Sequence, residues 1–364
     1  MKLFIEPTDV WLFRDNKPFD AGSDHRTVSQ FPPSPRVIAG VLRSHHLVIK
    51  GVDLRCPSSA EIIKLVGTSD DPPAGFRLRG PVLARWENEK LIRYYPLPAD
   101  AFLGEVEKGL EVYQAQIPTS RPYGLKANLP NGLLLLRHHY YGQHKGKMAQ
   151  TGVWVAESDL LNYLLFGSLP AERVKESDEL FTIENRIGIG LNDATRSAQA
   201  TLLYEVGFVR LRELVGLMVE VSGLDGSEDW PRRGMISIGG ENRAGQFHRV
   251  DDGQVPEWPE NQSKEWPHFK IYFLTPACFD RGWQPSDWGK WFTKTLRLVG
   301  AAIHRPMLLG GHDLAQHTPK AVRRYVPAGA VYFFEGEPSL KPNITAISDY
   351  GAKLGFGQFM LGRW

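Results

Sequence analysis

The stretch 238-IGGENRAGQF-247 combines three glycines with a Glu-Asn-Arg triplet, residue types that can hold an anion. Glycine lets the backbone approach a ligand closely, so that successive N–H groups can bind phosphate oxygens. Gly240 and Gly245 have the spacing of a P-loop, but Gln246 and Phe247 stand where Lys and Ser or Thr would be needed. The residues that follow also lack the helical periodicity of a dinucleotide fingerprint. The stretch therefore predicts either an anion contact or a plain tight turn.

Two further glycine-bearing loops, 310-GGHD-313 and 355-GFG-357, are also flanked by Arg, His or Lys. Backbone donors and Arg side chains together can hold a curved sugar-phosphate chain without a metal ion. A bare turn is the alternative at each loop, because Gly is the commonest turn residue. The candidate contacts to such a chain are Gly239, Gly240, Arg243, Gly310, Gly311, Gly355, Phe356 and Gly357.

Several other cations could contact phosphate. Arg14, at the end of the first predicted strand, could clamp a phosphate or form a solvated pair with Asp15. Arg36 and Arg43 share the first predicted helix, and from the sequence alone both are expected to be solvated.

Arg186 and Arg196 flank a Gly-rich pair of predicted strands, where cations could follow a strand of RNA. Lys320 lies in 317-HTPKAVRR-324, the most basic short run near the C-terminus. Its alternative role is to guard a strand edge against non-specific pairing. We include Arg14, Arg36, Arg43, Arg186, Arg196 and Lys320 among the candidate contacts.

Histidine is the residue type that could act as a general acid or base here. His45 and His46 lie late on the first predicted helix, but His45 falls on its apolar stripe, which favours a packed imidazole. His312 and His317 are five residues apart and lack the spacing of a helical metal site. We therefore predict no catalytic residue, no metal and no cofactor.

The 364 residues, 42% of them hydrophobic, suffice for two domains with their own cores. A formal charge of +2 does not by itself indicate a nucleic-acid binder. Cys56 and Cys278 are the only cysteines, which excludes a disulfide framework. The sequence has no apolar run long enough for a membrane span and no signal peptide, so we expect a cytoplasmic protein without membrane contact.

The periodicity of the N-terminal part predicts strands and two helices. Ser34, Pro35 and Gly51 are suited to the N-cap, N1 and C′ positions of a helix over 31–51. A second helix, over 158–167, is expected between Ser158 and Gly167. Alternation and β-branched residues predict strands at 2–13, 80–86, 91–97, 181–192, 200–211 and 215–223. Residues 100–150 are predicted to be an insertion.

Beyond a linker at 251–267, the pattern is compact. Strands are predicted at 269–279, 299–308, 321–335 and 356–364, with helices at 286–298 and 344–352. This order is the βαββαβ motif of ferredoxin-like, or RRM-like, domains. Since the N-terminal half begins in the same way, we predict an α+β protein with tandem ferredoxin-like domains, 1–262 and 263–364, with insertions in the first and glycine-rich loops.

The sequence resembles the RAMP superfamily of CRISPR proteins, and in particular the Cmr-type subunit of type III-B effector complexes that holds the 5′ tag of the guide RNA. The resemblance rests on VWLFRDNKPFDAG, FPPSP, RIGIGLNDATRSAQATLLY, IGGENRAGQF, YFLTPACF, PKAVRRYVPAGAVYFF and GFGQFMLG, in this order from end to end.

The resemblance implies a non-catalytic subunit in antiviral defence that binds single-stranded crRNA. Its implied partners are the large polymerase/cyclase-like subunit and neighbouring backbone RAMP subunits. One alternative is a metal-independent RAMP endoribonuclease that processes precursor crRNA with His45 or His46. A weaker alternative is a small-molecule enzyme on a ferredoxin-like scaffold.

Overall fold

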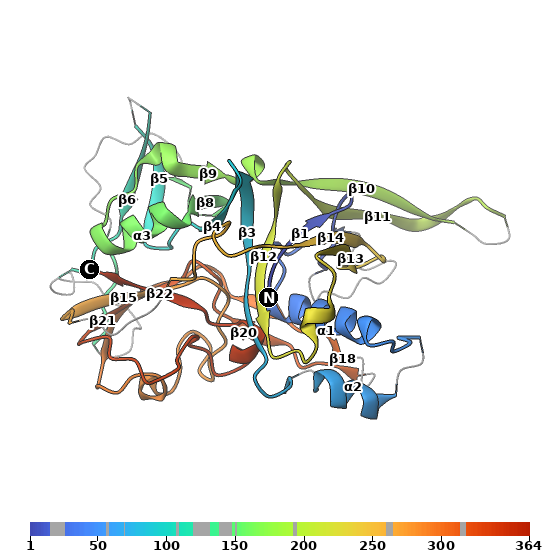
Figure 1. Cartoon of the computed structure of the whole chain (residues 1–364). Helices are drawn as coiled ribbons and strands as arrows, with labels where there is room; N and C mark the ends of the chain where they lie inside the picture. The colour runs from blue at the N-terminus through green and yellow to red at the C-terminus, as the bar shows by residue number, and fades with distance from the viewer. Residues whose placement is uncertain are drawn as a thin grey trace.

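The computed structural model describes residues 1–14, 26–55, 58–68, 70–106, 109–118, 132–137, 148–149, 151–191, 195–259, 265–313 and 318–364. It is a strand-rich mixed α+β fold built mainly from antiparallel sheets (Figure 1). Cys56 and most of the basic segment 137–147 lie outside the described residues. Within the described part of the chain, no helix is both long and apolar enough to cross a membrane.

The larger sheet has eight strands. Their spatial order is β13 (Arg233–Ser237), β14 (Ala244–Arg249), β1 (Lys2–Pro7), β12 (Val215–Ser222), β3 (Arg77–Glu87), β4 (Lys90–Pro96), β8 (Val153–Ala156) and β9 (Val174–Glu176). The second sheet has the order β16 (Arg297–Ala302), β21 (Val331–Glu335), β15 (His268–Phe273) and β22 (Phe359–Arg363). Counted along the chain, β14, β1, β12 and β3 are the fourth, first, third and second strands of a unit, and β22, β15, β21 and β16 repeat that order. This repetition is consistent with tandem ferredoxin-like units.

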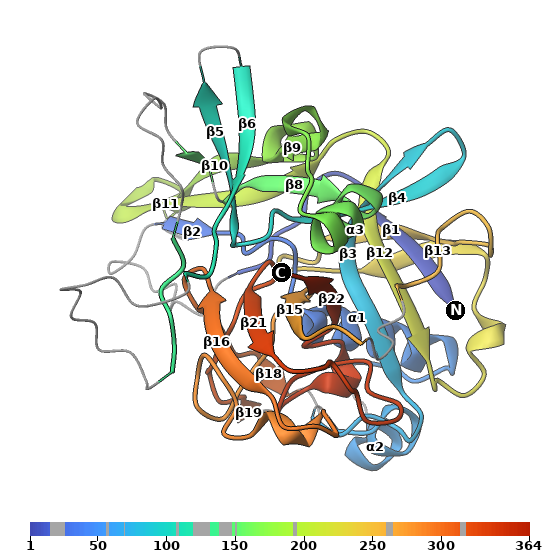
Figure 2. The same ribbon diagram turned by 90° about the vertical axis from the view of Figure 1, so that its left-hand side faces the viewer.

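Smaller sheets extend from this body. A long hairpin of β10 (Phe181–Leu191) and β11 (Ala198–Leu211) projects to one side and pairs with β2 (Arg26–Val28). The insertion forms β5 (Ala101–Val106), β6 (Gly109–Gln114) and β7 (Met148–Ala149), seen at the top of Figure 2. Two short ribbons pair β17 (Met307–Leu309) with β20 (Arg323–Tyr325), and β18 (His312–Asp313) with β19 (Thr318–Pro319).

The helices are α1 (Pro35–Ile49), α2 (Ser59–Val66) and α3 (Glu157–Phe166). The described residues also form short 3-10 helices, η1 (Ala171–Arg173), η2 (Ser177–Glu179), η3 (Ser227–Asp229), η4 (Trp288–Lys290) and η5 (Ala352–Leu354). Helix α1 confirms the prediction, since Ser34 is its N-cap residue and Gly51 follows its end with a φ of 82°. Helix α3 begins two residues earlier than predicted, with Ala156 rather than Ser158 at the N-cap. Helix α2 was not predicted.

Two layers of core lie on opposite faces of the larger sheet. On one face, Ile38 and Leu42 of α1 pack against Leu3 and Ile5 of β1. On the other face, Val82 and Met218 share a core with Tyr272, Val331 and Met360 of the second sheet. The two sheets are therefore joined by a common apolar layer, which fixes the positions of their loops relative to each other.

The two helices predicted in the C-terminal part were wrong. In 286–298 only η4 is helical, because Trp288 packs edge-on against Phe334, with ring centroids 4.8 Å apart, and the Asp287 carboxylate accepts a hydrogen bond from Gly289 N–H. In 344–352 the backbone pairs with other segments: Ile347 N–H donates to Gly357 O and Asp349 N–H to Cys278 O. Long-range pairing and aromatic packing replace the local helical bonds there.

Several predicted strands were too long. The strand predicted over 269–279 ends at Phe273, and the strand predicted over 299–308 is divided into β16 and β17. The strand predicted over 2–13 ends at Pro7, after which Trp11 crosses to pair with Val209 of β11. The strand predicted over 321–335 is divided into β20 and β21 by Pro327, which cannot donate a ladder hydrogen bond, and by Gly329 at a φ of 88°.

Candidate nucleic-acid interface

Most of the predicted contacts gather in two clusters. We call the first the hairpin-base cluster; it consists of Asp9, Arg14, Glu184, Arg186, Phe208, Arg210, Gly239, Gly240, Glu241 and Arg243. We call the second the α1 cluster; it consists of Arg36, Arg43, Asp70, Gly310, Gly311, Asp313, Lys320 and Tyr325. Each cluster joins residues from segments far apart in the sequence.

The hairpin-base cluster is a network of four arginines and three carboxylates. Asp9 pairs with Arg210 at 3.0 Å, with Arg186 at 3.3 Å and with Arg243 at 3.8 Å. Glu184 accepts hydrogen bonds from Arg210 at 2.5 Å and Arg186 at 2.7 Å, and these bonds lower the pKa of Glu184. The network is half-exposed, so its cations remain within reach of an anion from solvent.

An aromatic ring underlies this network. The guanidinium carbons of Arg243 and Arg186 lie 4.7 and 5.0 Å from the ring centroid of Phe208, which is buried. Such cation–π contacts fix the orientation of the guanidinium plane. Arg14 adds a weaker contact, 3.8 Å from Glu241. The cluster thus holds three of the predicted cations in one place.

The glycine-rich stretch 238–247 contains the turn between β13 and β14. Gly240 N–H donates to Leu12 O at 2.8 Å, and Gly239, Glu241 and Asn242 all have positive φ. The turn packs on the chain's own N-terminal segment, and its close approach to Leu12 explains the first glycine. Arg243 follows directly and extends over Phe208.

Gly239 and Gly240 are expected to respond differently to substitution. In Gly239→Ala, a Cβ would lie 2.8 Å from Leu12 O on a residue with φ 89°, so the free energy of unfolding should fall by about 1–2 kcal/mol or more. In Gly240→Ala the nearest atom is a Leu12 side-chain carbon at 3.5 Å, so the melting temperature should be unchanged. Thermal melts of the two variants check this, and equal destabilisation would contradict it.

The α1 cluster lies where helix α1 meets the ribbons of the C-terminal part. Arg43 is 9% exposed and donates to Gly67 O and Thr68 O at 3.0 and 2.6 Å, so it holds the end of α2. Arg36 lies 3.4 Å from Asp70 and 3.5 Å from the Tyr325 hydroxyl. The sequence-based expectation that Arg36 and Arg43 are solvated was wrong, because both are largely covered by these neighbours.

Lys320 completes the α1 cluster. Its backbone N–H donates to Gly311 O at 2.9 Å, which places the predicted 310–311 loop beside it. Burial lowers the pKa of the Lys320 amine, and the charge of Arg36 lowers it further, while Asp313 and Asp70 act in the opposite direction. The amine is thus half-buried beside two arginines and two carboxylates, and burial is the main cause of its lowered pKa.

Three of the clustered arginines retain an unused donor. The Nε–H groups of Arg36, Arg43 and Arg243 are buried and have no hydrogen-bond partner within the described ranges of the chain. Buried donors are normally satisfied, so each such group calls for a bound water or ligand atom.

The GFG motif has a packing role in this structure. Phe356 is fully buried with its ring 4.7 Å from that of Tyr325, directly behind the α1 cluster. Gly355 has a φ of 98° and approaches Gly80 O so closely that a Cβ would lie 2.8 Å away. Gly357, at φ 73°, approaches Ile347 in the same way. We therefore leave Gly355, Phe356 and Gly357 out of the proposed interface.

Arg196 lies apart from both clusters. It is exposed, with a φ of 54°, on the far end of the β10–β11 hairpin. The residues that sequence reasoning missed are Asp9, Glu184, Phe208, Arg210, Asp70 and Tyr325. The strand alternation of Arg186 with Glu184, and of Arg210 with Phe208, could have indicated their shared face.

A family model described as CRISPR-associated protein (Cas_Cmr3) matches residues 3–364. The chain belongs to the Cas_Cmr3 family. It is therefore a RAMP subunit of the type III-B Cmr complex, which confirms the resemblance of its motifs. No curated protein matches the chain.

Two solved Cmr structures contain a similar fold. One is the cryo-EM structure of the type III-B Cmr-beta bound to cognate target RNA and AMPPnP, state 1, at 15% identity and a TM-score of 0.52. The other is the cryo-EM structure of Cmr-beta bound to cognate target RNA, at 16% identity and a TM-score of 0.52. Each match covers 92% of this chain and 86% of the other. At this identity the likeness shows the fold alone.

The two histidines of the nuclease alternative are packed in this Cmr3-family chain. His46 is 1% exposed and its Nδ1 accepts a hydrogen bond from Trp230 Nε1 at 3.2 Å. His45 packs edge-on against Trp230 and Phe247, with ring centroids 4.7 and 5.3 Å away. Burial lowers the pKa of both imidazoles. Both groups therefore have the environment of core histidines.

Proposed function

We propose that this chain is a non-catalytic RNA-binding subunit that holds the 5′ tag of the crRNA within the Cmr complex. The observation that carries the proposal is the convergence of Arg14, Arg186 and Arg243, from three distant segments, in one ion-pair network, with Phe208 beneath Arg186 and Arg243. Phosphate contacts position RNA through such arginines, because the guanidinium group can donate two parallel hydrogen bonds.

The α1 cluster supplies a second set of cations for the same strand of RNA. Lys320 and Arg36 are half-buried, and the Nε–H groups of Arg36 and Arg43 are unsatisfied. The two clusters would hold phosphates at two places along the strand, and the Gly239–Gly240 and Gly310–Gly311 turns would let the backbone approach the RNA.

Docking of other subunits is supported by the β10–β11 hairpin. Ile187, Ile189 and Leu203 lie on one face of its outer part and are 71%, 54% and 56% exposed. Apolar side chains gathered on a projecting element favour a protein partner. We assign this face to a neighbouring RAMP subunit. We also propose that the chain docks the large polymerase/cyclase-like subunit, without assigning that contact to a particular face.

Single alanine substitutions test the RNA contacts. Arg243→Ala, Arg186→Ala and Lys320→Ala should each weaken guide-RNA binding and make its salt dependence shallower by about one phosphate equivalent. Fluorescence anisotropy across a salt series, with the subunit alone and in the assembled complex, measures both quantities. Arg173→Ala is the matched control, since Arg173 is exposed and belongs to neither cluster. Unchanged affinity and slope would remove a residue from the site.

A cleavage assay distinguishes the proposed non-catalytic function from the endoribonuclease alternative. The pure protein should leave repeat-containing precursor RNA intact in EDTA. Specific cleavage that His45→Ala abolishes would overturn the non-catalytic assignment.

A further inference from the structure

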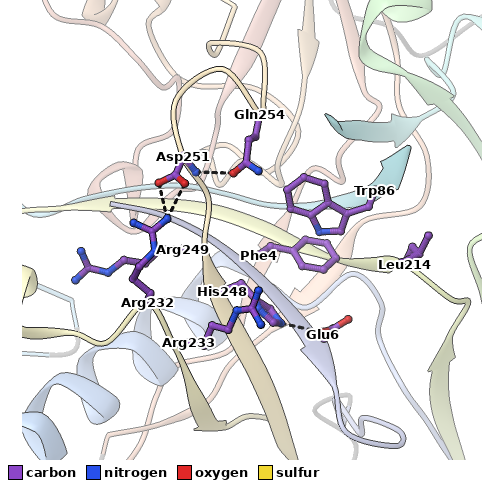
Figure 3. Close-up of a pocket in the computed structure, with 10 residues that line it drawn as sticks. All are labelled: Phe4, Glu6, Trp86, Leu214, Arg232, Arg233, His248, Arg249, Asp251 and Gln254. Atoms are coloured by element: carbon purple, nitrogen blue, oxygen red, sulfur yellow. Dashed lines mark hydrogen bonds and ion pairs between the residues drawn. The ribbon is translucent and has the colours of Figure 1, made fainter. Parts of the chain in front are cut away.

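A pocket of about 370 Å³ opens on the larger sheet, apart from both clusters (Figure 3). It lies on the face of β13, β14 and β1 that points away from helix α1. In register across these strands, Arg233, His248 and Phe4 are neighbours on this face. Asp251 and Gln254, from the segment after β14, form the upper rim. The volume falls within the range of small-ligand sites.

One side of the pocket is aromatic and apolar. The Trp86 indole, partly exposed, is held edge-on by the buried Phe4 ring, with centroids 5.8 Å apart. Beside it, Leu214 has a φ of 62° and is 52% exposed. A leucine in the left-handed region costs about 1–2 kcal/mol. This φ belongs to the turn between β11 and β12, where Val215 N–H donates to Arg212 O at 3.1 Å, and the turn leaves the Leu214 side chain exposed beside the indole.

The other side is cationic. Arg232 is already engaged by both carboxylate oxygens of Asp251, at 2.6 and 2.8 Å, and Arg249 donates to Ser227 O at 2.7 Å. His248 contacts Glu6 at 2.9 Å. Arg233 is exposed, and its side chain has no hydrogen bond or ion pair with any described residue of the chain. It is the charge that remains available to an incoming group.

We propose that this pocket binds one nucleotide, with its base on Trp86 and Leu214 and its phosphate on Arg233. Trp86 on β3 and Arg233 on β13 line the pocket from its two sides, with Phe4 of β1 between them. An aromatic side chain can stack on any base and a guanidinium group binds phosphate, so the lining offers a partner for each end of a nucleotide. The nucleotide is either a free nucleoside monophosphate or one unit of single-stranded RNA. The second case rests on the proposed function, and the first does not.

The test uses the full-length protein and two kinds of probe. Calorimetry measures binding of AMP and CMP, and anisotropy measures binding of a short unstructured oligoribonucleotide. Arg233→Ala and Trp86→Ala should each weaken binding of the probe about tenfold. Trp86→Phe retains an aromatic face and should bind the probe with nearly the affinity of the unsubstituted protein. Arg173→Ala is again the control. Ultraviolet crosslinking should label the tryptic peptide 86–90, which contains Trp86.

The outcomes distinguish the sources. If Arg233→Ala and Trp86→Ala weaken the binding of AMP or CMP, the pocket is a site for free nucleotides. If the protein binds no mononucleotide and these variants weaken oligonucleotide binding, the pocket is an RNA subsite. Arg233→Ala alters an exposed side chain, so it remains informative if Trp86→Ala unfolds the protein. The proposal is overturned if neither probe responds to Arg233→Ala, or if that variant impairs only assembly with a partner subunit. Oligonucleotide binding that depends on Arg243 and Lys320 but not on the pocket would leave the proposed function intact and remove only this site.

Discussion

Glu157→Gln should lower the free energy of unfolding by about 3–5 kcal/mol, because it leaves a buried guanidinium group without its counter-charge. Glu157 accepts hydrogen bonds from Arg93 Nε and Nη2 at 2.7 and 2.6 Å, and from the Tyr95 hydroxyl at 2.8 Å. Side-chain exposure is 1% for Arg93 and 8% for Glu157. Glutamine keeps the shape and one acceptor but removes the charge.

The consequence extends to the segment after β14. Arg93 also donates to Glu257 O at 2.9 Å and lies 4.3 Å from the Trp258 ring centroid, so it anchors the chain that runs from the nucleotide pocket towards the second sheet. Chemical denaturation with an intrinsic-fluorescence readout measures the loss. Glu179→Gln, in the exposed Lys175–Glu179 pair, is the control and should change stability by less than about 1 kcal/mol. If Glu157→Gln and Glu179→Gln both lower the free energy of unfolding by the same small amount, the buried Arg93–Glu157 pair is not fully charged.

Asp9→Asn should tighten guide-RNA binding, about tenfold at low salt. Asp9 pairs with Arg186, Arg210 and Arg243, so in the free protein it competes with phosphate for the same guanidinium groups. Removal of this carboxylate leaves the cluster with more positive charge, and the dependence of affinity on salt should become steeper by about one phosphate equivalent. Because Asp9 is about half exposed, little stability should be lost.

Anisotropy over a salt series, together with a thermal melt, separates this prediction from a structural role of Asp9. Asp53→Asn is a control of the same type, since it releases Arg55 from an exposed ion pair that belongs neither to the clusters nor to the pocket. Weaker RNA binding by Asp9→Asn with an unchanged melting temperature would mean that Asp9 orients the arginines for RNA instead of competing with it.

The sequence by itself determined the elements whose signals are local. Ser34, Pro35 and the apolar stripe of residues 35–49 define α1, and strand alternation defines β3, β4, β10, β11 and β12, because caps and periodicity act within a few residues. The ordered motifs also determined the family. The same local rules failed at 286–298, where Trp288 packs on Phe334 of the second sheet, and at 344–352, where backbone groups bond to distant segments.

Only the tertiary structure decided how the candidate residues are grouped. Arg14, Arg186 and Arg243 are scattered in the sequence, and their convergence depends on the crossing of residue 11 to β11 and on the β13–β14 turn packing against Leu12. The tertiary structure also shows that Phe356 is packed in the core rather than exposed beside the cations. It shows that Asp9 is the shared counter-charge of Arg186, Arg210 and Arg243. Charge pairing and burial act between residues close in space, whatever their separation along the chain, so no local pattern could indicate them.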